Sequence, residues 1–103
     1  MSDSNYNFDL LFNNEFVYML APMEKYTDTA FRTLCFIYGA DLTFTEMARI
    51  DGLVRKNKST VAKITNLDET YTQIQIFGAN LNKLGKFLLN FKPEPGFKGF
   101  NLN

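Results

Sequence analysis

Histidine is absent from this 103-residue sequence, and cysteine occurs once, as Cys35. The first absence removes the commonest general base and the commonest neutral metal ligand. A single cysteine provides neither an internal disulfide nor the paired thiolates of a zinc site, and it favours a reducing compartment. No Gly-x-Gly-x-x-Gly and no Gly-x-x-x-x-Gly-Lys-Ser/Thr motif occurs. The sequence therefore predicts no metal site and neither of these nucleotide-binding loops.

Net charge and long apolar segments are lacking as well. Eleven Lys and Arg residues balance eleven Asp and Glu residues, so the chain as a whole has no field that would attract nucleic acid or an anionic membrane. The longest apolar run, residues 16–23, is far shorter than the roughly 20 residues that span a bilayer. No secretory signal pattern opens the sequence. We therefore expect a soluble, cytoplasmic protein that does not associate with membranes.

The composition fits one small globular domain. Hydrophobic residues make up 46% of the chain and charged residues 21%, which argues against intrinsic disorder. Residues 1–15 are rich in Asn, Asp and Ser and are expected to form a flexible leader. The domain is expected to occupy residues 16–103.

Strand and helix patterns alternate through residues 16–103. A short apolar run closed by a proline predicts a first strand over residues 16–21, buried on both faces. Thr27 or Asp28 can cap the helix that follows, and Gly39 can end it. Further elements are strands over 42–47, 71–77 and from 97 onward, short helical segments within 49–64, and a helix capped by Asn80.

Two of the expected helices carry an apolar stripe, because apolar residues recur on one face at helical spacing. The single cysteine lies in the first stripe and is expected to be a core residue. The first stripe comprises Phe31, Leu34, Cys35 and Tyr38, and the second comprises Leu81, Leu84, Leu88 and Phe91.

The spacing of the strands indicates the fold class. They are expected to begin near residues 16, 42, 71 and 97, with 26, 29 and 26 residues between successive starts. Strand–helix–strand units of this period form parallel sheets. Four such units correspond to half of a (β/α)8 barrel or to a small doubly wound sheet, and element order alone leaves both open.

Short motifs along the chain resemble the opening of tRNA-dihydrouridine synthases. The resemblance covers residues 17–103, with six motifs in the family's order at compatible spacing. The pair Glu24-Lys25 departs from the Ala-Gly that many members have after Pro-Met. The motifs are Leu20-Ala21-Pro22-Met23; Thr27-Asp28 with Phe31-Arg32 and Leu34-Cys35; Tyr38-Gly39-Ala40-Asp41-Leu42; Thr45-Glu46-Met47; Gln75-Ile76-Phe77-Gly78; and Phe97 with Gly99-Phe100-Asn101-Leu102-Asn103.

This resemblance implies both a fold and an activity. The implied fold is the N-terminal half of an FMN-binding (β/α)8 TIM barrel, with four parallel strands and intervening helices, truncated at the fourth strand. Members of the family reduce particular uridines in tRNA to 5,6-dihydrouridine, and NADPH or NADH reloads the flavin. The expected cofactor is therefore FMN, the reductant is NADPH or NADH, and the partner is tRNA.

The resemblance also implies roles for individual residues. Pro22 and Met23 match the loop that lies against the isoalloxazine ring of FMN, at the carboxyl end of the first strand. Gln75 matches the glutamine that hydrogen-bonds the polar edge of the flavin, where an amide can both donate and accept. Asn103 matches the asparagine that contacts the target uridine. The family's general acid, the cysteine of Asn-x-Gly-Cys-Pro, is expected just beyond Asn103, so these 103 residues alone are expected to be inactive.

Several residues also have simpler interpretations. On the simpler interpretation, Pro22 only ends a strand. Gln75, which alternates with two isoleucines, would then be only a polar residue on the other face of its strand. Glu46 either faces the site or is a surface carboxylate. A stretch of five cations and one carboxylate either binds phosphates or, more simply, is a solvated helix face. This basic stretch comprises Arg49, Arg55, Lys56, Lys58 and Lys63, with Asp51.

Two other functions stay open at the level of sequence. One is another FMN-dependent barrel oxidoreductase, similar to dihydroorotate dehydrogenase. The other is a non-catalytic, flavodoxin-like binding domain. Half a barrel also exposes the edges of its first and last strands, so we expect the fragment to self-associate through them.

Overall fold

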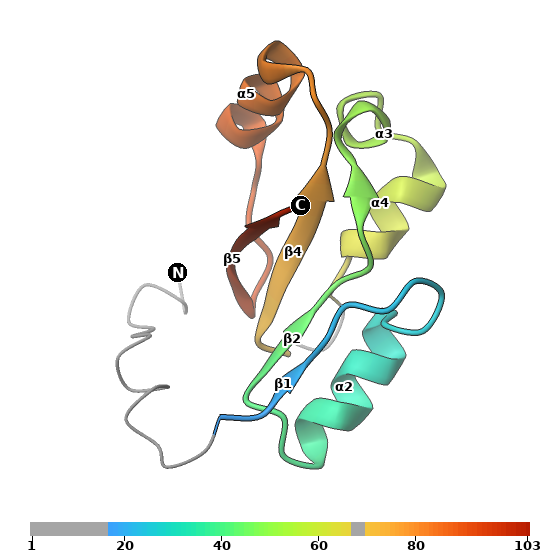
Figure 1. Ribbon diagram of the computed structural model, residues 1–103, viewed down its shortest axis with the longest axis vertical. Coiled ribbons are helices and arrows are strands. Elements are labelled where there is room, and N and C mark those ends of the chain that lie inside the picture. Colours follow the sequence, from blue (N-terminus) through green and yellow to red (C-terminus); the bar gives the residue numbers. More distant parts are fainter. Residues whose placement is uncertain (1–16, 67–69) are drawn as a thin grey trace.

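The computed structural model describes residues 17–66 and 70–103. The leader expected over residues 1–15 lies outside the described residues. Among the described helices, none has the length and apolar character needed to cross a bilayer. Strand and helical segments alternate as the sequence predicts, although the second strand segment is divided into two short strands and the helical segment after it into two short helices (Figure 1). The helices are α2 (Thr29–Ile37), α3 (Ile50–Val54), α4 (Lys58–Ile64) and α5 (Leu81–Asn90), and the strands are β1 (Met19–Leu20), β2 (Leu42–Phe44), β3 (Ala48–Arg49), β4 (Thr72–Phe77) and β5 (Phe97–Leu102).

The described strands form one parallel sheet in which neighbours along the chain are neighbours in space. β1 pairs with β2, whereas β4 pairs with β2 and β3 along one edge and with β5 along the other. β2 and β3 pair with successive parts of the same edge of β4, so together they occupy one strand position in the sheet. The order of strand positions is therefore β1, β2/β3, β4, β5. Consecutive order of this kind is that of a (β/α)8 barrel, whereas a flavodoxin-like sheet places its first strand between the second and the third. The chain is therefore an α/β protein with the strand order of part of a TIM barrel.

The second strand position is interrupted by a bulge. Thr43 is partnered with Thr72 and Ala48 with Ile76, so the offset between partners changes from 29 to 28 residues. One extra residue is accommodated between β2 and β3, and such a bulge bends a strand and redirects its side chains. The continuous strand predicted over residues 42–47 is wrong in this respect.

One face of the sheet carries the hydrophobic core. Along β4, Ile74 and Ile76 are buried on this face, while Gln73 and Gln75 alternate with them on the other, as the sequence predicts. Side chains from α3, α4 and α5 cover the core face. The buried cluster comprises Ala48, Ile50, Leu53, Ile74 and Ile76, with Val54, Ile64, Leu84, Phe87, Phe91, Phe97 and Phe100 packed against it.

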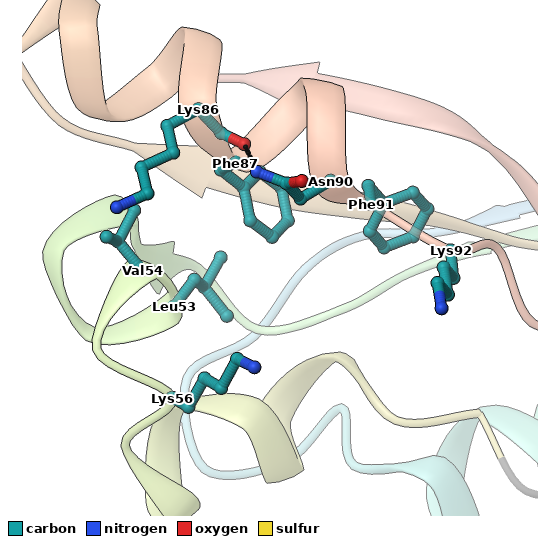
Figure 2. Close-up of a pocket in the computed structure, with 8 residues that line it drawn as sticks. All are labelled: Leu53, Val54, Lys56, Lys86, Phe87, Asn90, Phe91 and Lys92. Atoms are coloured by element: carbon teal, nitrogen blue, oxygen red, sulfur yellow. Dashed lines mark hydrogen bonds between the residues drawn. The ribbon is translucent and has the colours of Figure 1, made fainter.

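Aromatic contacts join α5 to β5. The ring centroid of Phe91 lies 4.9 Å from those of Phe97 and Phe100, and Phe87 lies 5.7 Å from Phe100. A hollow of about 560 Å³ lies between α3 and α5. Phe87, Phe91 and Leu53 are among the residues that line it (Figure 2). These aromatic residues anchor the last described strand to the core.

The boundaries of the two longest helices follow the sequence signals. The side chain of Asp28 caps α2 by accepting a hydrogen bond from the backbone N–H of Phe31 at 2.8 Å. Gly39 follows α2 with a φ of 113°, in the left-handed region that favours glycine. Asn80 caps α5 by accepting from the backbone N–H of Lys83 at 3.1 Å.

The apolar stripe predicted for α2 is wrong as a core face. Leu34 is 52% exposed and Tyr38 is 84% exposed, whereas Arg32 is fully buried. Cys35 is half-buried. The inner face of α2 is instead the one that carries Arg32, whose guanidinium donates to the carbonyl oxygens of Thr27 and Thr65. The ring of Phe36 also packs against that of Tyr71, with centroids 5.3 Å apart.

Of the four residues in the apolar stripe predicted for α5, two face the core and two are exposed. Leu84 and Phe91 pack against the core together with Phe87, which lies between them at helical spacing. Leu81 is 80% exposed and Leu88 is also exposed. The inner face of α5 is therefore centred on Phe87, and the two leucines lie at its edges.

Candidate functional site

The chain leaves β1 through a tight turn that positions Met23. The carbonyl oxygen of Met23 accepts hydrogen bonds from the backbone N–H groups of Tyr26 and Thr27, both at 3.0 Å. The hydroxyl of Thr27 is fully buried and lies 3.0 Å from both the N–H and the carbonyl oxygen of Met23. Pro22 precedes the turn with a fixed φ. The Met23 side chain is 38% exposed at the carboxyl end of β1.

Glu46 lies in the bulge between β2 and β3, and its side chain holds the same turn by a hydrogen bond. Its Oε1 accepts a hydrogen bond from the backbone N–H of Lys25 at 2.6 Å, and the residue is only 9% exposed. A hydrogen bond between a carboxylate and a backbone N–H is charge-assisted and therefore strong. The interpretation of Glu46 as a surface carboxylate is thus wrong, because it holds the turn that contains Met23.

Thr45 connects this bulge to β4. Its backbone N–H donates to the carbonyl oxygen of Gln73 at 3.0 Å. Its hydroxyl accepts from the backbone N–H of Gln75 at 3.0 Å and donates to the carbonyl oxygen of Glu46 at 2.8 Å. Where the bulge interrupts regular strand pairing, this hydroxyl therefore replaces a backbone carbonyl as the acceptor for the backbone N–H of Gln75.

Polar side chains line the face of the sheet opposite the core, toward its carboxyl edge. Gln75 is partnered with Asn101 in the register between β4 and β5. The half-buried side-chain amide of Gln75 forms no hydrogen bond with another described residue, so it can donate to and accept from a ligand. The backbone N–H of Asn103 donates to the carbonyl oxygen of Ile76 at 2.9 Å, and Asn103 itself is exposed just after β5.

A buried arginine ties the turn after β1 to α4. Nη1 of Arg32 donates to the carbonyl oxygen of Thr27 at 2.7 Å, and Nη2 donates to that of Thr65 at 2.8 Å. Burial lowers the pKa of Arg32, although a guanidinium stays charged at neutral pH. Three carboxylates oppose this shift, those of Asp28, Glu46 and Glu94. Arg32 was not predicted from the sequence as a residue that positions the site.

A chain of hydrogen bonds connects the turn after β1, which carries Pro22 and Met23, with Gln75 of β4. The turn that holds Pro22 and Met23 is bound to Glu46, whose neighbour Thr45 is bound to Gln75. An exposed apolar side chain and an available amide on such a frame suit a planar ring with a polar edge. Within residues 17–66 and 70–103, no group of three or more His, Cys, Asp or Glu side chains is placed to hold a metal ion.

Comparison with known proteins decides the family. The family model described as dihydrouridine synthase matches residues 19–103. The chain belongs to the dihydrouridine synthase family. It is 37% identical over 68 residues to a probable tRNA-dihydrouridine synthase of Aquifex aeolicus (strain VF5), a match that covers 66% of this chain and 22% of that protein. It is 39% identical over 61 residues to a probable tRNA-dihydrouridine synthase of Treponema pallidum (strain Nichols), covering 58% of this chain and 18% of that protein. The matched segments span about a fifth of these relatives.

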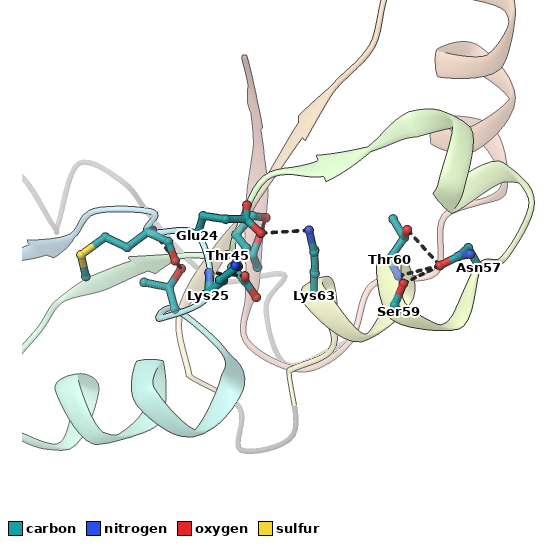
Figure 3. Close-up of polar contacts among 10 residues, drawn as sticks. Glu24, Lys25, Thr45, Asn57, Ser59, Thr60 and Lys63 are labelled. Carbon is teal, nitrogen blue, oxygen red and sulfur yellow. Dashed lines mark hydrogen bonds and ion pairs between the residues drawn. The ribbon is translucent and has the colours of Figure 1, made fainter.

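The departure from the family pattern at Glu24-Lys25 has a structural counterpart. Lys25 has a φ of 69°, in the left-handed region, at the position where the resemblance predicts glycine. Glu24 forms an ion pair with Lys63 of α4 (Figure 3), with 3.1 Å between Oε1 and Nζ. The turn thus keeps the backbone conformation that suits glycine, and the extra carboxylate is paired with α4.

Replacing Lys25 by glycine is expected to stabilise the protein. A left-handed conformation costs an L-residue about 1 kcal/mol or more, a cost that glycine avoids, while the N–H that binds Glu46 is retained. We expect the free energy of unfolding to rise by about 0.5 kcal/mol, after the greater freedom of glycine in the unfolded chain is subtracted. Urea unfolding of the product of the full open reading frame, hereafter the full-length protein, measures this change. The control is Tyr26→Gly, which should destabilise the turn, and a loss of stability in Lys25→Gly would contradict the prediction.

Proposed function

We propose that this chain forms the first strand–helix units of the barrel of a tRNA-dihydrouridine synthase that uses FMN to reduce uridine in tRNA to 5,6-dihydrouridine. NADPH or NADH reloads the flavin, and the reaction takes place in the cytoplasm. The observation that carries the proposal is the family match over residues 19–103, which includes every described strand. The consecutive order of parallel strands supports it, because it brings the ends of β1, β4 and β5 to one edge of the sheet.

The residues at this edge fit the isoalloxazine ring of FMN. The ring has apolar faces and an edge that presents both hydrogen-bond donors and acceptors. Pro22 and Met23 offer backbone and an exposed apolar side chain on a hydrogen-bonded turn. Gln75 offers a primary amide without a partner among the described residues, which can donate and accept at the ring edge. When bound, FMN would supply the hydride that reduces uridine.

Asn103 is proposed to contact the uridine, since its backbone is fixed to β4 and its side chain is exposed. The general acid that protonates carbon 5 of uridine is proposed to be a cysteine following Asn103, in the family's Asn-x-Gly-Cys-Pro motif. Cys35 does not suit this role, because it lies in a hollow with Leu20 and Gly39, near the amino end of β2. The 103 residues by themselves are therefore expected to be inactive.

Substitution of Gln75 tests the proposed function. In the full-length protein, Gln75→Ala is expected to weaken FMN binding about tenfold, because hydrogen bonds worth roughly 1.4 kcal/mol to the flavin edge are lost. Gln73→Ala is the matched control, since Gln73 lies on the same face but its amide already contacts the carbonyl oxygen of Lys98 at 3.4 Å. Flavin fluorescence titration gives the affinities. Equal affinities in both variants and the unaltered protein would contradict the role of Gln75, and an unaltered protein that binds no FMN would contradict the proposed function.

The 103 residues expressed alone are expected to self-associate. Among the described strands, β1 pairs only with β2 and β5 only with β4, so one edge of each has no partner strand. Apolar side chains such as Ile37, Tyr38 and Leu102 are also exposed. Unpaired edges of this kind favour pairing between chains. Sedimentation velocity should show dimers or larger species that increase with concentration, and a monomer at every concentration would contradict this prediction.

A further inference from the structure

A cationic pocket opens beside the turn after β1. Its volume is about 350 Å³, and residues of this turn, β3, α3, α4 and the end of β4 line it. The cations in its lining are Arg49, Arg55 and Lys63, and Glu24 and Phe77 lie beside them. This arginine pocket contains three members of the basic stretch that the sequence analysis most simply assigned to a solvated helix face.

The positive charge of the arginine pocket is only partly balanced. Glu24 is the carboxylate in its described lining, and it pairs with Lys63 at 3.1 Å. Asp51 of α3 is paired instead with a lysine of α5 at 3.3 Å. Within the described residues neither Arg49 nor Arg55 has a carboxylate partner. Two uncompensated cations therefore share one pocket, although the net charge of the whole chain is zero.

Several groups in the lining of the pocket can act as hydrogen-bond donors. The guanidinium carbon of Arg49 lies 4.8 Å from the ring centroid of Phe77, its partner in the register between β3 and β4. Stacking on a ring leaves the N–H groups along the edge of a guanidinium available for bidentate contact with an oxyanion. Asn57 uses Oδ1 to accept from the backbone N–H and the hydroxyl of Thr60, as Figure 3 shows, which leaves its side-chain N–H groups to donate. The pocket thus offers several donors to an anion.

The arginine pocket adjoins the candidate flavin and uridine site. Glu24 directly follows Met23, and Phe77 lies two residues after Gln75 on the same face of β4. We propose that the arginine pocket binds a backbone phosphate of the RNA substrate close to the uridine that is reduced, with Arg49 and Arg55 as its main donors. This inference rests on the proposed function, because that function brings an RNA to this edge of the sheet. Contacts between arginine and phosphate position a nucleic acid without reading its sequence and release counterions.

The test compares charge-removing variants of the full-length, FMN-loaded protein. Arg49→Gln and Arg55→Gln are each expected to weaken tRNA binding about fivefold near physiological salt, and to reduce the slope of log affinity against log salt by about 1. Arg49→Lys keeps the charge but loses the planar fork, so an intermediate loss is expected. Lys86→Gln is the matched control, since Lys86 is an exposed cation of α5 outside the pocket, and its tRNA affinity should not change. FMN affinity should be the same in all these variants, which also shows that they fold.

The possible outcomes separate this inference from the proposed function. If the unaltered protein binds tRNA and both arginine variants bind it equally well with the same salt slope, the arginine pocket is not a phosphate site, and the proposed function stands. An equal loss in Lys86→Gln would also overturn the inference, because a general field and not a pocket would then attract the RNA. If the unaltered protein neither binds tRNA nor forms dihydrouridine, the proposed function fails and the inference fails with it.

Discussion

Arg32→Met is expected to lower the free energy of unfolding of the full-length protein by roughly 3 kcal/mol. The guanidinium is buried and donates to the carbonyl oxygens of Thr27 and Thr65, so its removal leaves two backbone acceptors without these charged donors. Methionine keeps most of the apolar stem and fills the space. Relief from burying a cation offsets part of the loss, since burial already lowers the pKa of Arg32. Urea unfolding followed by circular dichroism measures the change.

Arg32→Lys separates the charge of Arg32 from its geometry. Lysine retains a cation but has no planar fork that reaches both Thr27 and Thr65, so we expect about half of the destabilisation. Because Thr27 belongs to the turn that holds Met23, both variants should also bind FMN more weakly. Arg32→Met with stability within about 1 kcal/mol of the unaltered protein would show that this residue does not hold the turn against α4.

Thr45→Val is expected to destabilise the full-length protein by about 2 kcal/mol and to weaken FMN binding. Valine has nearly the same shape but no hydroxyl, so the backbone N–H of Gln75 loses its acceptor and the carbonyl oxygen of Glu46 loses a donor. Thr45 itself is fully buried, so water does not readily replace these hydrogen bonds. Gln75 would then be less well fixed for its proposed contact with the flavin edge.

Thr45→Ser is the matched control, because serine keeps the hydroxyl and loses only a buried methyl group worth about 0.8 kcal/mol. FMN affinity should be unchanged in the serine variant and reduced in the valine variant. If the two variants have the same stability and the same FMN affinity, the hydroxyl of Thr45 has no part in supporting the bulge or Gln75.

Local signals in the sequence predicted much of the fold. The alternation of Ile74 and Ile76 with polar residues gave the orientation of Gln75, because side chains of a strand point to opposite faces. Asp28 and Gly39 marked the ends of α2, since a capping oxygen and a left-handed glycine act within a single turn of the chain. The period of the strands predicted a parallel sheet, and the pairing of β1, β2/β3, β4 and β5 resolved its order.

The features that were missed depend on contacts between distant segments. An arginine beside an apolar stripe usually faces solvent, and only the approach of Thr65 and the turn after β1 makes Arg32 the buried residue of α2. The bulge at Thr45 is visible only as a change of register against β4. The arginine pocket likewise combines Arg49 and Arg55 with Phe77, which follows them by more than twenty residues in the sequence.

The most direct test of the central claim is to express the full open reading frame in a bacterial strain that lacks its own dihydrouridine synthases. The purified protein is examined for bound flavin, and the tRNA of the strain is analysed for dihydrouridine by mass spectrometry. We expect a protein that carries FMN and tRNA in which dihydrouridine has reappeared, with both signals reduced in Gln75→Ala. A folded, soluble protein that carries no flavin and leaves every tRNA uridine unreduced would contradict the claim that this chain belongs to a working tRNA-dihydrouridine synthase.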